Sequence, residues 1–140
     1  MNASIRELLL ACLLLAGCGE PNGFEQGCQS QVSFSVSDGL TPQLGWSPDC
    51  KLGLVAVAVY PGLSMTPGER ISAEWMIQAE GQLGPDNLLQ APLRYGELPS
   101  GAISRQGPQP LVAGGHYVVQ GWVYDLEGRP IGAGTTAFRP

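Results

Sequence analysis

The sequence is poor in the side chains that acid–base catalysis and nucleic-acid binding require. It contains one histidine, His116, and 7 Lys and Arg against 12 Asp and Glu in 140 residues. No motif places a nucleophile beside that imidazole, so there is little basis for a catalytic site. A net negative charge, with no run of Lys and Arg residues, argues against binding to nucleic acid. We therefore expect a protein that is neither an enzyme nor a nucleic-acid-binding protein.

Long apolar runs, long helices and clustered metal ligands are also missing. Residues 8–16 form the longest apolar run, which is too short for a bilayer span of about 20 residues. The 20 glycines and 12 prolines disfavour long helices, because both residues interrupt helix interiors. One histidine and scattered carboxylates, including Asp125 and Glu127 in one turn, provide too few ligands for a zinc or calcium site. We expect no metal and no cofactor.

The most informative stretch is residues 15–18 (LAGC), directly behind the apolar run. The small residues Ala16 and Gly17 suit a peptidase cleavage site, and the thiol of Cys18 is a nucleophile that can take a thioether-linked lipid. This motif resembles the lipobox of bacterial lipoproteins. The resemblance implies a signal peptide over residues 1–17 and acyl chains such as palmitate on Cys18. The alternative is an ordinary signal peptide that is cut elsewhere and leaves Cys18 as a free thiol.

The same resemblance implies a position in the bacterial cell envelope, with the membrane contacted through the lipid on Cys18. Gly19 follows the lipid site instead of the aspartate that retains lipoproteins of enteric bacteria at the inner membrane, so the outer membrane is preferred. Residues 18–30 are rich in glycine and polar groups and predict a flexible tether. Residues 31–140 are expected to form the folded domain.

Two cysteines, Cys28 and Cys50, remain when Cys12 leaves with the signal peptide and Cys18 carries lipid. An even pair in an oxidising compartment favours a disulfide bond. Closing a loop of roughly 20 residues in this way stabilises the folded state by on the order of 3 kcal/mol. We expect a Cys28–Cys50 disulfide.

Alternation of apolar and polar residues predicts strands through most of the mature chain. Residues 52–60 are apolar on both faces, which predicts a central strand covered on both sides. Residues 117–124 and 131–138, with a turn between them, predict a hairpin. With further extended segments at residues 32–36, 40–47, 88–95 and 102–105, the chain is expected to form an antiparallel sandwich of about seven strands.

Residues 66–81 allow two interpretations. Residues 71–79 alternate with a period of two, which favours a strand with Ala73 and Trp75 on the same face. Thr66, Pro67 and Glu69 instead match a capping box with proline in the first turn, which is typical of a helix start. The strand is favoured because more positions match it.

Several positions resemble fibronectin type III-like domains, which have an immunoglobulin-like fold. Leu111, Gly115 and Tyr117, with Phe138 near the end, resemble the final hairpin of these domains, in which a leucine six residues before a tyrosine precedes the strand. Trp46 resembles the tryptophan that such domains carry on an early strand. The resemblance implies an all-β, immunoglobulin-like sandwich, and it says little about function because this fold serves many functions.

The candidate binding surface consists of Trp122 and Tyr124. If Tyr117 and every second residue after it face the core, these two aromatic residues face outward. Outward aromatic side chains favour recognition of an envelope protein or a glycan. The alternatives are that residues 83–110 lie over them, or that the alternation is reversed. We expect a non-catalytic binding or structural lipoprotein; the alternative is a small membrane-anchored enzyme accessory or inhibitor protein.

Overall fold

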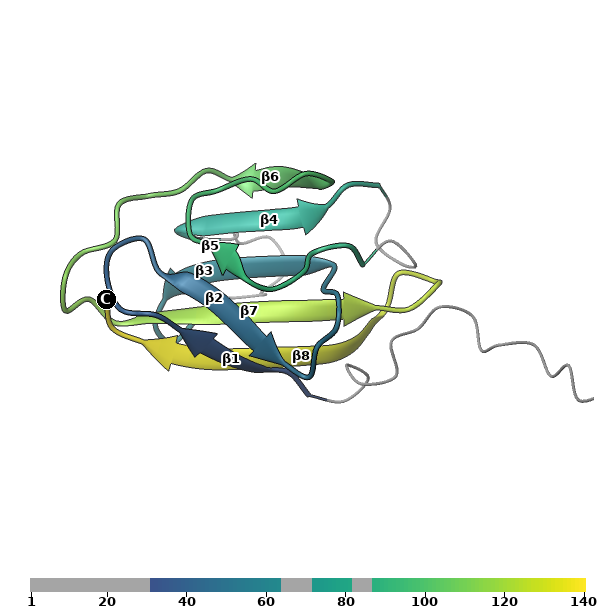
Figure 1. The fold of residues 1–140 in the computed structure, drawn as a ribbon, viewed down its shortest axis with the longest axis horizontal. Coiled ribbons are helices and arrows are strands. Elements are labelled where there is room, and N and C mark those ends of the chain that lie inside the picture. The colour runs from purple at the N-terminus through teal and green to yellow at the C-terminus, as the bar shows by residue number, and fades with distance from the viewer. Residues whose placement is uncertain (1–30, 64–71, 82–86) are drawn as a thin grey trace, which may run out of the picture.

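The computed structural model describes residues 31–63, 72–81 and 87–140, which form two antiparallel sheets and no helix (Figure 1). One sheet has the strand order β1-β2-β5 and the other the order β6-β4-β3-β7-β8. The expected all-β, two-sheet class is confirmed, with eight strands in these residues where about seven were expected. The strands are β1 (Ser33–Val36), β2 (Gln43–Ser47), β3 (Leu54–Val59), β4 (Trp75–Ala79), β5 (Leu93–Arg94), β6 (Ala102–Gln106), β7 (Tyr117–Tyr124) and β8 (Pro130–Phe138).

One hydrophobic core fills the space between the two sheets. Trp75 on β4 is its largest fully buried side chain, and Trp46 on β2 packs edge-on against Phe34. The indole N–H of Trp46 donates to the backbone carbonyl of Cys50 at 2.7 Å, so this buried polar group is satisfied. Val55, Val57 and Val119 pack against these residues from the five-stranded sheet.

β4 resolves the ambiguous segment in favour of a strand over Trp75–Ala79. Residues 64–71, which include the capping-box positions, lie outside the described residues. The expected alternation was wrong at Ala73, which packs with Met76 on the outer face instead of with Trp75 in the core. The reason is a bend at Glu74, whose N–H donates to the carbonyl of Val57, so the alternation restarts at the beginning of β4.

β7 begins at Tyr117, whose ring is buried and whose hydroxyl accepts a hydrogen bond from the backbone N–H of Val112 at 3.0 Å. Leu111, six residues before Tyr117, is buried in the same core. The pair holds the connection between β6 and β7 against the end of the sandwich.

Replacing Tyr117 with phenylalanine is expected to lower the free energy of unfolding by about 1–2 kcal/mol, because the N–H of Val112 loses its acceptor. Urea denaturation measures this loss. Tyr60→Phe is the matched control, since the Tyr60 side chain is half exposed and its hydroxyl can bond to water. Equal stabilities for Tyr117→Phe and Tyr60→Phe would contradict a structural role for the Tyr117 hydroxyl.

The predicted N-terminal features precede the described part of the chain. Cys18 and Cys28 lie outside the described residues, whereas Cys50 is buried at the end of the sandwich where β2 ends. Lipidation of Cys18 and the Cys28–Cys50 disulfide therefore stay predictions. In the residues that the structure describes, no helix has the length and apolar character needed to cross a membrane.

Candidate functional site

The outer face of the five-stranded sheet carries a second hydrophobic cluster, separate from the core. Sandwich sheets usually present polar residues on this face, so apolar side chains here indicate a surface that is covered or that binds something. We call this set the outer cluster: buried Ala56, Ala73 and Met76, with the partly buried Leu54, Leu63 and Trp122 packed against them.

Trp122 lies in the outer cluster because of its position on β7. Tyr117, Val119 and Val123 belong to the core, and a Cβ at Gly121 would meet the core residues Phe34 and Leu52, so the residues that alternate with these four face outward. Trp122 pairs with Leu54 across the β3–β7 ladder, and both side chains are partly buried on that face. The indole therefore packs against aliphatic neighbours and keeps part of its surface in solvent.

The connection that follows β3 folds back over the outer face. The backbone N–H of Leu63 donates to the side-chain carbonyl of Gln120 at 2.9 Å, and the Leu63 side chain packs against the outer cluster. Gln120 precedes Trp122 by two residues on β7 and therefore faces the same way. Leu63 thus packs on the same face of the sheet as Trp122.

Tyr124, the second candidate residue, is partly buried, and the β7–β8 register shifts between Val123 and Tyr124. The side chain of Asn87 forms hydrogen bonds with the backbone of Tyr124 in the way that a neighbouring strand would. The side-chain oxygen of Asn87 accepts from the Tyr124 N–H at 3.1 Å, and the amide nitrogen of Asn87 donates to the Tyr124 carbonyl at 2.8 Å. Gly53 leaves room for this contact, because a Cβ there would lie 2.7 Å from both Asn87 and the Tyr124 ring. Burial raises the pKa of Tyr124. Asn87 thus brings part of the 83–110 segment against Tyr124.

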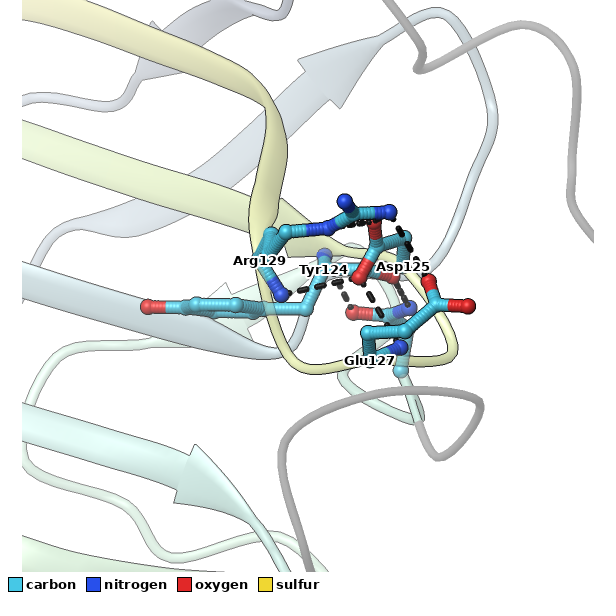
Figure 2. A network of polar contacts seen from close by, with 5 residues as sticks. Tyr124, Asp125, Glu127 and Arg129 are labelled. Carbon is cyan, nitrogen blue, oxygen red and sulfur yellow. Dashed lines mark hydrogen bonds and ion pairs between the residues drawn. The ribbon is translucent and has the colours of Figure 1, made fainter.

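A polar network closes the turn between β7 and β8 (Figure 2). The Asp125 carboxylate accepts hydrogen bonds from the backbone N–H groups of Glu127 and Arg129, at 3.0 and 2.8 Å. The guanidinium of Arg129 binds both Asp125 and Glu127, at 2.7 and 3.0 Å. The backbone hydrogen bond from Arg129, together with the guanidinium, holds the pKa of Asp125 below its ordinary value. Asp125 and Glu127 therefore stabilise the turn. In the described residues, no three His, Cys, Asp or Glu side chains lie close enough together to bind a metal ion.

A groove of about 500 Å³ opens at the opposite end of the sandwich. Tyr95 lies at this groove, and its hydroxyl donates to the carbonyl of Gln109 at 2.6 Å. Burial, with a smaller contribution from the charge of Glu74, raises the pKa of Tyr95 to about 12, so the hydroxyl stays protonated as a donor. Leu40 and the exposed ion pair between Arg94 and Glu97 also line the groove.

His116 lies just before β7 and is exposed. Its ring stacks on Tyr60, with ring centroids 4.1 Å apart and planes 9° from parallel. The backbone N–H of Tyr60 donates to the His116 carbonyl at 2.9 Å. This pair forms an aromatic contact at the end of the five-stranded sheet.

Sequence reasoning did not identify three parts of these surfaces: Leu63 in the outer cluster, Asn87 beside Tyr124, and the groove at Tyr95. Each comes from residues far apart in the chain, and no local motif marks any of them. The outward position of Trp122, in contrast, follows from alternation along one strand. Comparison with protein-family models, curated proteins and solved structures finds no match to this chain, so a function can be proposed only from its own residues and geometry.

Proposed function

We propose that this protein is a lipid-anchored bacterial envelope protein whose sandwich domain is a non-catalytic binding module. The observation that supports this function most directly is the outer cluster, where Trp122 lies partly exposed among aliphatic side chains. An indole that is already held by its neighbours loses little side-chain entropy on binding, and buried aromatic residues contribute a large share of interface energy. The ligand class is an envelope protein or a glycan.

The fold proposed for this module is immunoglobulin-like, close to the fibronectin type III type. The order of β3, β7 and β8 in one sheet and of β1, β2 and β5 in the other is the order in which such sandwiches place strands C, F, G and A, B, E. The bond to the Tyr117 hydroxyl resembles the tyrosine corner at the start of strand F. β4 and β6 extend the five-stranded sheet beyond this common arrangement.

The anchor proposed is a lipid on Cys18, exposed by removal of residues 1–17. Support for it comes from the LAGC motif and the apolar run before it. A single acyl chain holds a protein to a membrane only reversibly, whereas two or more give a stable anchor. Residues 18–30 would then tether the module at the membrane surface, with the outer membrane preferred because Gly19 follows the lipid site.

Trp122→Ala is expected to abolish most partner capture while leaving the protein folded. We expect a loss in free energy of unfolding of about 1–2 kcal/mol, below the 3–5 kcal/mol typical for a core tryptophan, because the indole is only partly buried. Full-length protein with a C-terminal tag is solubilised from membranes, and the proteins and glycans that it retains are identified by mass spectrometry.

Tyr60→Ala is the matched control for removal of a surface aromatic ring, since Tyr60 is half exposed and does not belong to the outer cluster. It should retain the partner. If Trp122→Ala captures the same molecules as the unmodified protein, the outer cluster is not the binding surface. If Trp122→Ala unfolds, the indole is part of the core, and the proposal that Trp122 is a binding residue is wrong.

A further inference from the structure

The described chain begins in contact with the middle of β8. Gln31 forms a parallel bridge with Ala133, and the N–H of Val32 donates to the Ala133 carbonyl at 3.2 Å. Because the two segments run parallel, the described chain runs toward Phe138, and Gln31 itself lies nearer to Pro130, where β8 begins. That is the end of the sandwich with the β7–β8 turn, opposite to the C-terminus (Figure 1).

The distance to the proposed lipid is short at this end. Cys18 precedes Gln31 by thirteen residues, and a flexible chain of that length has a root-mean-square reach of about 20 Å. A lipid on Cys18 would therefore keep the β7–β8 turn closer to the membrane than the opposite end of the sandwich.

The same end exposes two leucines. Leu126, in the β7–β8 turn, is 50% exposed, and Leu88 is 47% exposed. Leu88 follows Asn87, whose side chain binds the backbone of Tyr124 two residues before Leu126, so both leucines lie at this end. Exposed leucines stabilise contact with a lipid surface because they leave water when they enter the interfacial region.

The charges of the turn are largely compensated. Arg129 forms ion pairs with Asp125 at 2.7 Å and with Glu127 at 3.0 Å, which leaves a net charge of about one negative unit. The turn therefore has no strong electrostatic attraction to a lipid surface. Its contact would depend on the leucines and on the short tether, and would be strongest on a mainly zwitterionic bilayer.

We infer that the β7–β8 turn end of the domain rests on the lipid surface through Leu88 and Leu126, and that the groove at Tyr95 faces away from the membrane. This orientation depends on the lipid proposed for Cys18. It leaves the groove open to molecules in the aqueous compartment.

Protection from a glutamate-specific protease tests the orientation. The side chains of Glu127, in the turn, and Glu97, at the groove, are equally exposed at 65% and 67%. Full-length lipidated protein in which Glu20 and Glu25 of the tether are replaced by glutamine, so that the protease does not detach the domain from its lipid, is placed in phosphatidylethanolamine vesicles with a minor fraction of phosphatidylglycerol. Relative to the lipid-free Cys18→Ser protein, cleavage after Glu127 should slow about tenfold, the ratio that burial of one exposed leucine can provide. Cleavage after Glu97 should keep its rate.

Two double variants identify the groups responsible. Leu88→Ser with Leu126→Ser should restore cleavage after Glu127. Leu40→Ser with Val112→Ser is the matched control, because these residues are 48% and 65% exposed at or next to the groove, and it should leave the protection intact.

The outcomes separate this orientation from the anchor itself. If mass spectrometry finds lipid on Cys18 but both glutamates are cleaved at the lipid-free rates, or if both are protected equally, the orientation is wrong and the anchor stands. If Cys18 carries no lipid, the anchor is wrong and the orientation falls with it.

Discussion

Gly134→Ala is expected to lower the free energy of unfolding by about 3 kcal/mol or more. A Cβ at this position would overlap the carbonyl oxygen of Val32 and lie 2.8 Å from the carbonyl carbon and Cβ of the same residue. The backbone of Val32 is held in place by its bond to Ala133, so a change of side-chain rotamer cannot relieve the overlap. The first described residues would have to separate from β8, and their contacts with the core would weaken.

Urea denaturation of Gly134→Ala and Gly107→Ala measures this effect against a matched control. At Gly107 no atom would lie within 4 Å of an added Cβ, so that substitution should leave the stability nearly unchanged. Similar stabilities for the two variants would mean that the segment before β1 does not pack closely on β8 in solution.

Cys18→Ser is expected to remove the protein from the membrane fraction or to leave it unprocessed with its signal peptide attached. Serine lacks the thiol on which the lipid would form, and the mature domain is held by no other proposed anchor of comparable strength. The effect should be near complete, because the leucines of the β7–β8 turn alone give only weak, reversible contact. Cell fractionation and mass spectrometry of the intact protein measure it.

Cys12→Ser is the matched control, since Cys12 lies within the signal peptide and would be removed with it. It should be processed, lipidated and retained like the unmodified protein. Membrane retention of a correctly cleaved Cys18→Ser protein would contradict the lipid anchor.

Local sequence patterns predicted the strands best where alternation and turn residues agree. The expected strand over residues 117–124 has the observed bounds of β7, and the returning strand differs from β8 by one residue. The strand expected over residues 102–105 is also observed, as β6 with one further residue. Agreement was poorer between residues 87 and 95, where the sequence has little periodicity. There, β5 has two residues, although a longer extended segment was expected. Pairing partners decide whether such short segments join a sheet, and these partners are distant in sequence.

The candidate site likewise has features that follow from the local sequence and features that depend on residues distant in the chain. The outward direction of Trp122 follows from alternation, because successive side chains on a strand point to opposite faces. The partial burial of Trp122 does not follow from alternation, since it results from packing against Ala56, Ala73 and Met76, which lie on or beside other strands. Gln78 is a further example: a polar residue on an outer face is expected to be exposed, yet it is 5% exposed and its side-chain oxygen accepts from Arg105 on β6 at 2.8 Å.

The sequence by itself determined the all-β class, the final hairpin and the face of β7 on which Trp122 lies, because these depend on covalent geometry and on neighbours within a few residues. Only the tertiary structure decided how much of that face remains open. It also decided that Asn87 binds Tyr124, and that a groove forms at Tyr95. These features depend on the paths of loops between distant strands, and a loop path is set by the whole packed core rather than by the residues of the loop alone.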